Sequence, residues 1–163
     1  RQRQMCIRDS LYLQLEAIKK QLVPILLSQL AGCIIGVVSV VVIAKLMGAP
    51  QEIIYSLAPK SVTTPIAMEV ADTLGGIPAL TAAVVVCVGL LGSIVGIKTL
   101  KLTRIKSPIA QGLSLGAAAH AVGTSTAMDI SSKYGAYASL GLTLNGIFTA
   151  LLTPTILRLL GLL

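Results

Sequence analysis

The chain has 163 residues, of which 55% are hydrophobic and 12% are charged, and its mean hydropathy is +0.88. Soluble domains carry about a quarter charged residues, so this composition excludes an ordinary soluble domain. The formal net charge is +7, but the cations flank apolar runs, and one Phe and no Trp leave little for stacking on nucleic-acid bases. We therefore predict an all-α integral membrane protein with no nucleic-acid partner.

Residues 1–10 do not fit the pattern of the rest. They are polar, they lack an initiating Met at position 1, and they show no signal-peptide pattern. We interpret them as extraneous, disordered sequence, and we expect a polytopic membrane domain over residues 11–163 whose own N-terminal part is missing. A short amphipathic segment, Leu11–Lys20, leads into the first span.

Three apolar runs are long enough to approach or reach the roughly 20 residues that cross a bilayer core. They are Leu22–Met47, Ile77–Ile97 and Ala136–Leu163. The basic loop Lys98–Lys106 follows the second run.

Two broken helices lie between these spans, because Gly and Pro interrupt both intervening segments. The first is predicted as two short helices, Gln51–Ala58 and Pro65–Leu74, which meet at Pro59–Thr64. The second is predicted as helices Ile109–Ala119 and Thr126–Tyr134, which meet at His120–Gly123, with Thr124 or Ser125 as the cap. Gly75 and Gly135 are expected to end the two segments.

The sequence contains an internal duplication. Ala58–Glu69 aligns with Ala118–Asp129 at an offset of 60 without gaps, so that Lys60 falls on His120. The same offset places Gly32 and Gly36 on Gly92 and Gly96, two GxxxG faces that favour helix packing in membranes. We predict one repeat over about residues 22–82, a second over about residues 82–142, and a final span over residues 136–163.

Flanking Lys and Arg residues mark the cytoplasmic side of a membrane. Lys19 and Lys20 precede the first span and the basic loop follows the second, so the two spans should be antiparallel. Each broken segment is then a re-entrant hairpin, and the two hairpins enter from opposite sides as an inverted repeat. The alternative, in which both broken helices cross the membrane fully, would place the basic loop outside.

Paired broken helices in the two halves of a membrane protein point to a transporter's binding site. A helix N-terminus receives anions, and an ionisable group at membrane depth is usually functional. We therefore predict that the two breaks together bind a small carboxylate. The predicted substrate-binding residues are Lys60, Ser61, Thr63, Thr64, Pro65, His120, Gly123, Thr124, Ser125 and Thr126.

Four residues are candidates for ion or proton coupling: Glu69, His120, Asp129 and Asn145. Of these, His is the type that titrates near neutral pH. Glu69 and Asp129 have alternative roles as partners of Lys60 and His120 or as first-turn charges favoured by the helix dipole.

Structural roles remain open for the other candidates. Lys60 could reach an interface or interact with the end of its own helix, His120 could be a structural histidine, and Asn145 could make a plain interhelical hydrogen bond. The enzyme motifs HExxH, GxSxG, GxGxxG and the Walker loop are absent from the sequence, so we expect neither an enzyme nor a cofactor or metal site.

Several of these segments resemble the LrgB/CidB family. The resemblance is carried by Leu57–Ala67 (LAPKSVTTPIA), Gly75–Thr81, Gly112–Gly116, His120–Thr124, Gly135–Leu140 and the pair Asn145 and Gly146. It implies a multi-pass protein of the bacterial inner membrane. Family members are described as holin/antiholin-like regulators of murein hydrolase activity and lysis that act with a small LrgA/CidA-type partner, and a plant relative is the plastidal glycolate/glycerate translocator.

Two functions follow from this combination. The first is transport of small carboxylates of the glycolate, glycerate or pyruvate kind by alternating access at the paired broken helices. The second is a holin/antiholin-like protein that regulates murein hydrolases through partner contacts. We also expect lipid contact along the spans and a homo-oligomer.

Overall fold

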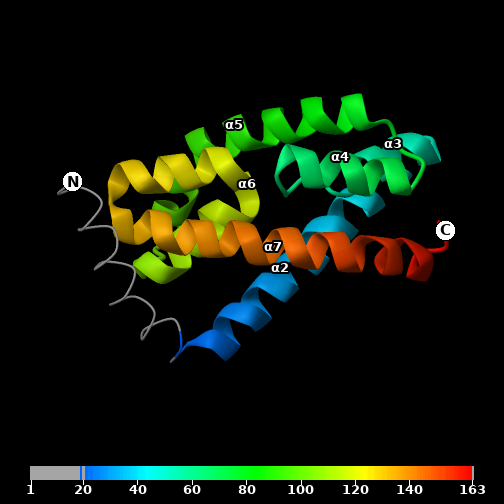
Figure 1. The fold of residues 1–163 in the computed structure, drawn as a ribbon. Coiled ribbons are helices and arrows are strands. Elements are labelled where there is room, and N and C mark those ends of the chain that lie inside the picture. The colour runs from blue at the N-terminus through cyan, green and yellow to red at the C-terminus, as the bar shows by residue number, and fades with distance from the viewer. Residues whose placement is uncertain (1–18, 20, 163) are drawn as a thin grey trace.

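The structure is a computed structural model that describes residues 19 and 21–162. All regular elements of this part of the chain are α-helices (Figure 1). They are α2 (Leu22–Leu46), α3 (Gln51–Leu57), α4 (Thr64–Thr73), α5 (Pro78–Leu102), α6 (Pro108–Ile130) and α7 (Ser132–Leu159). The segment interpreted as extraneous, residues 1–10, and the predicted lead-in helix, apart from Lys19, lie outside the described residues.

Three helices, α2, α5 and α7, are long and apolar enough to cross a membrane. Their outward faces carry large apolar side chains such as Ile35, Leu91 and Leu151, each more than 60% exposed. Such faces are stable only against lipid or another apolar surface. The prediction of an all-α, multi-pass membrane protein is confirmed.

The helices α3 and α4 form the first re-entrant hairpin. The chain enters after Pro50, turns at Pro59–Thr63, and returns so that α4 ends beside the start of α5 (Figure 1). Gly75 ends α4 with a φ of +82°, a conformation that glycine adopts without steric cost. The predicted boundaries differ from the observed ones by one residue.

The second hairpin is the single helix α6, which reverses at one residue. His120 has φ 41° and ψ −129°, and the second arm folds back so that Gly123 packs against Leu115 of the first arm. The predicted break over His120–Gly123 is therefore too long. A cap at Thr124 or Ser125 is also wrong, because both residues lie inside the kinked helix.

The predicted end of the second segment at Gly135 is wrong as well. The chain leaves α6 after Ile130, and Ser131, with extended backbone, caps α7 by accepting a hydrogen bond from the Tyr134 amide at 3.4 Å. Gly135 is a helical residue of α7, and it packs against Met128 of α6. Glycine is needed there for close approach and not for a turn.

The helix α2 begins and α5 ends at the same end of the molecule (Figure 1), and exposed cations lie in the segments that meet there. They are Lys19, Lys98, Lys101, Arg104, Lys106 and Lys133. The expected basic loop is shorter than predicted, because Lys98 and Lys101 lie on the last turns of α5. The positive-inside rule places this end in the cytoplasm. That the first hairpin enters from outside and the second from inside stays a prediction from this charge pattern.

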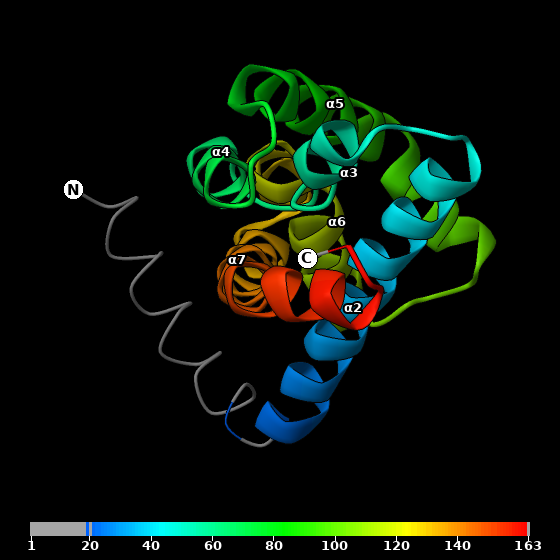
Figure 2. The same ribbon diagram turned by 90° about the vertical axis from the view of Figure 1, so that its right-hand side faces the viewer.

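Viewed end on, α6 lies between α5, α7 and α2 (Figure 2). Its contact with α7 depends on glycine: a Cβ on Gly112 would lie 2.7 Å from the Tyr134 carbonyl oxygen, and one on Gly116 would overlap the Ala138 backbone. The first arm of α6, Pro108–Ala119, is therefore held against α7 by backbone contact. This fixed arm forms one wall of the cavity described below.

Candidate functional site

A cavity of about 440 Å³ lies where the tip of the first hairpin meets α2, the first arm of α6 and α7. Lys60 and Ser61 of the tip line it. The other lining residues are Ser28, Gln29, Gly32, Cys33, Gly36, Val37, Ala58, Ala110, Leu113, Ser114, Ala117, Ala118, Asn145 and Thr149. The lining therefore combines small and apolar residues with a few polar groups, as is usual for small-molecule sites.

Asn145 of α7 joins the two hairpins at this cavity. Its side-chain Nδ2 donates to the Ser61 carbonyl oxygen at 2.7 Å and to the Ala117 carbonyl oxygen at 3.1 Å. Asn145 is itself buried. The interhelical hydrogen bond weighed for this residue is thus present, and it brings the first hairpin's tip next to the first arm of the second hairpin.

Among residues 19 and 21–162, Lys60 is the only charged residue that lines the cavity. Its Nζ donates to the Ser61 hydroxyl at 3.1 Å, and among the described residues no carboxylate balances its charge. An ammonium that is partly withdrawn from water without a counter-ion is unfavourable. The arrangement is suited to receive an anion.

Gln29 is a cavity residue that the sequence reasoning missed. Its side chain is 5% exposed, and its Oε1 is buried without a hydrogen-bond partner among the described residues. A buried amide oxygen without a donor costs free energy, which makes such a group a marker of an unfilled site. The signal was available in the sequence, because a Gln inside an otherwise apolar span is unusual.

Cys33 and Thr149 form a further polar contact on the cavity wall. The Cys33 Sγ and the Thr149 Oγ1 lie 3.4 Å apart and join α2 to α7. Neither residue was predicted as a site residue. From the sequence, Cys33 was interpreted as a small packing residue within a span. Its thiol supplies a native chemical probe of the cavity.

His120 does not line the cavity. Its ring is buried against α5, where Nε2 lies 2.9 Å from the Val85 carbonyl oxygen. Gly89 makes room for the ring, because a Cβ there would lie 2.5 Å from its Cε1. The tips of both hairpins therefore meet α7 near Asn145, but the His120 side chain points to the other side.

The hydroxyls that follow His120 bond to their own helix. Thr124 donates to the His120 carbonyl oxygen at 2.8 Å, and Thr126 donates to the Val122 carbonyl oxygen at 3.0 Å. Ser125 is exposed, and Gly123 is buried against the first arm. The structure does not bring this group of predicted residues together with Lys60 around the cavity.

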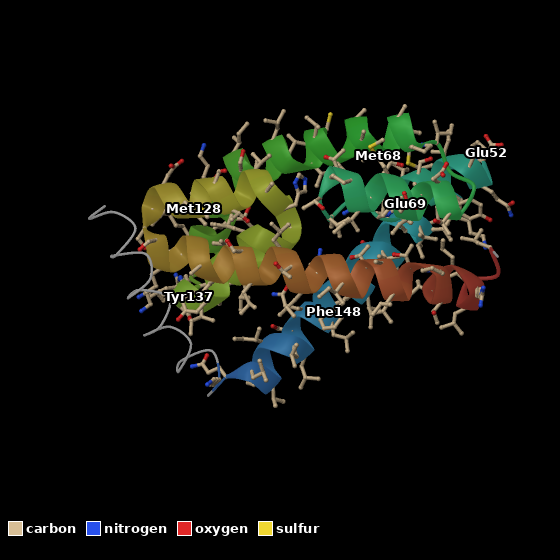
Figure 3. All side chains as sticks on the ribbon, in the orientation of Figure 1. Glu52, Met68, Glu69, Met128, Tyr137 and Phe148 are labelled. Atoms are coloured by element: carbon tan, nitrogen blue, oxygen red, sulfur yellow. The ribbon has the colours of Figure 1, made fainter. Side chains whose placement is uncertain are left out.

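The remaining predicted residues lie close to the tip or on the surface. Thr63 and Thr64 are partly buried at the start of α4, and Pro65 is exposed. Glu69 is exposed on α4 (Figure 3), and Asp129 is exposed near the end of α6. Within residues 21–162 no group of three or more His, Cys, Asp or Glu side chains could hold a metal ion.

The profile of the LrgB-like family matches residues 9–159. The chain belongs to this family. The LrgB-like chain is 40% identical to the uncharacterized protein YwbG of Bacillus subtilis over 90% of its own length and 65% of the relative's. It is 42% identical to an uncharacterized protein of Haemophilus influenzae over 91% and 64% of the two lengths.

A further relative is the holin-like protein CidB of Staphylococcus aureus, with 34% identity over 95% of this chain and 68% of the relative. This LrgB-like chain thus spans about two thirds of the length of the bacterial proteins it matches. No solved structure matches it significantly. The family, the bacterial relatives and the three spans together identify a multi-pass bacterial membrane protein.

Proposed function

We propose that this protein transports small carboxylates of the glycolate, glycerate or pyruvate kind by alternating access. The observation that carries the proposal is the cavity in which Lys60 and Ser61 of one hairpin tip lie beside the other hairpin, with Asn145 bonded to both. Binding sites between paired broken helices are the arrangement on which inverted-repeat transporters depend.

The chemistry of the cavity favours one negative charge. The Lys60 ammonium would hold the carboxylate, and the Ser61 hydroxyl beside it can donate a second hydrogen bond. In the part of the chain that the structure describes, no second cation lines the cavity, so a dicarboxylate would bury a charge without a partner. The amide of Gln29 can serve a second polar group of the substrate, and the apolar wall excludes water.

The other predicted residues keep subordinate roles in this proposal. Thr63, Thr64 and Pro65 place the start of α4 next to the tip, where its N–H groups favour an anion. His120 and its neighbours Gly123, Thr124, Ser125 and Thr126 would act only if the second hairpin moves. Glu69, Asp129 and Asn145 are the candidates for coupling to an ion or a proton.

The test is uptake of radiolabelled pyruvate and glycolate into liposomes that contain the purified chain. Lys60→Gln, which removes the charge and keeps a polar side chain of similar length, is expected to abolish saturable uptake. Lys45→Gln is the matched control, because Lys45 is exposed at the end of α2 and does not line the cavity. Equal uptake by the two variants would defeat the site assignment.

A second candidate function is favoured by the holin-like relatives. We propose as the alternative that the protein regulates murein hydrolase activity and lysis through a small LrgA/CidA-type membrane partner or through its own oligomers. Lysis in a bacterial host would then depend on the lipid-facing surfaces and would be unchanged by Lys60→Gln. Parallel measurement of uptake and lysis with this one variant separates the two functions.

A further inference from the structure

Two helix faces made of small residues line the cavity, one on α2 and one on the first arm of α6. On α2, Gly32 and Gly36 line the cavity, and no atom comes within 4 Å of the place that a Cβ would take. On the first arm of α6, Ala110, Ser114 and Ala118 line the same cavity at the same four-residue spacing. Faces of this kind allow helix backbones to approach closely in membranes.

In the second copy of the duplicated unit, the corresponding face of α5 is docked on the first arm of α6 at Leu115 and Ala119. A Cβ on Gly92 would lie 2.5 Å from the Ala119 Cβ, and one on Gly96 would lie 2.8 Å from the Leu115 Cδ2. These glycines are the counterparts of Gly32 and Gly36 at the offset of 60. In the second copy a hairpin arm therefore packs on this helix face, beside a groove that the same glycines line, whereas in the first copy no described atom comes within 4 Å of the Cβ positions.

We infer that α2 and the first arm of α6 close on each other, Gly32 and Gly36 against Ala110, Ser114 and Ala118, and that this closure seals the cavity. The inference rests on the proposed transport function and names its gate. Backbone contact holds the arm to α7, whereas α2 meets α7 through side chains such as Val37 and Val41, so α2 is the element that moves. The turn after α2 contains Gly48 at a φ of +74°, a place where the chain can change direction at little cost.

Closure would also bring a hydrogen-bond donor toward Gln29, the cavity residue with an unsatisfied side-chain atom among the described residues. The buried Oε1 of Gln29 has no partner in the open arrangement. The Ser114 hydroxyl lies on the opposite wall of the same cavity and would approach α2 as the faces meet. It is the donor that the closed state brings toward the Gln29 amide.

The first test is disulfide cross-linking in liposomes, in the full chain with Cys6, Cys33 and Cys87 replaced by Ala. The pair Gly32→Cys and Ser114→Cys is expected to cross-link under mild oxidation, and saturating pyruvate should raise the rate about fivefold or more. The matched control pair is Ala31→Cys with Ser114→Cys, because Ala31 is exposed and does not line the cavity. A test pair that cross-links no faster than this control overturns the closure, whether or not the protein transports pyruvate.

The second test places a bulky side chain between the two faces. No described atom lies within 4 Å of a Cβ at Gly32, so the Gly32→Leu variant should fold, but it should lose pyruvate uptake at least about tenfold because closure is blocked. Ala31→Leu is the control and should transport normally. Equal uptake by the two variants overturns the closure and leaves the proposed function standing, whereas absence of saturable uptake in the unaltered chain overturns the proposed function itself.

Discussion

The two copies of the repeated unit differ most where each hairpin tip meets its own span. In the second copy the His120 ring fills the space above Gly89 and bonds to the Val85 carbonyl oxygen. In the first copy the counterparts are Lys60 and Gln29, and a cavity remains between them and the neighbouring helices. The His120 side chain fills the space at one tip, and the other tip borders the polar cavity.

This difference shows how a duplicated membrane module can keep its fold and divide its roles. The second copy is a packed platform: glycines let α6 lie directly on α5 and α7. The first copy has polar groups and a cavity at its tip, where we propose the binding site. Four predictions, ordered from the largest expected effect to the smallest, test this division.

Gly116→Ser should have the largest effect, because Ser56 occupies the equivalent place in the first copy and the second copy has no room for it. A Cβ at position 116 would overlap the Ala138 backbone, so the first arm of α6 could no longer lie on α7. We expect the free energy of unfolding to fall by about 3 kcal/mol or more. Thermal unfolding in detergent measures it, and Gly36→Ser, on the open face, should unfold like the parent.

Gly89→Gln gives the second copy the residue of the first and should expel the His120 ring. The ring would lose both its space and its bond to the Val85 carbonyl oxygen, at a cost of about 2–3 kcal/mol. Adding His120→Lys completes the exchange and should restore part of the lost free energy of unfolding, because the Lys side chain need not lie over α5. No recovery in the double variant would argue against the correspondence of the two tips.

Asn145→Leu should separate the two copies at the point where they meet. The change leaves the Ser61 and Ala117 carbonyl oxygens without their donor, which should lower the free energy of unfolding by about 1–3 kcal/mol. Pyruvate uptake should fall as well, because the tip that carries Lys60 loses its support. Thr143→Leu, at an exposed position of the same helix, is the control for both measurements.

Glu69→Gln and Asp129→Asn should have the smallest effects on stability. Both carboxylates are exposed, so each change should alter the free energy of unfolding by less than about 0.5 kcal/mol. Uptake measured with and without a proton or sodium gradient then tests their predicted role in coupling. A variant that loses its dependence on the gradient while it still folds would identify the coupling residue.

Much of the architecture could be predicted from particular residues. Pro50, Pro108 and Gly75 mark helix boundaries by local geometry, and the boundaries lie within a residue or two of these positions. The cations around Lys98 and Lys106 predicted the direction of the spans. The predictions failed at Gly135, where the local signal for a helix end was overridden by close packing against Met128.

The candidate site could be predicted only in part. Lys60, Ser61 and Asn145 were candidates from their chemistry, and all three line the cavity. His120 carried an equally strong signal, but its ring turns to α5 because Gly89 leaves space for it there. Gln29 was missed, since its role depends on the absence of a partner for its oxygen and not on a motif.

The sequence by itself determined that this chain is a helical membrane protein with two related halves of opposite direction. Hydropathy, charge position and an ungapped repeat are local or periodic properties, and they hold whatever the side chains later contact. Only the tertiary structure decided which of the two hairpin tips borders the polar cavity. That choice depends on whether a side chain finds space on a neighbouring helix, and such space is created by residues distant in the chain, as Gly89 creates it for His120.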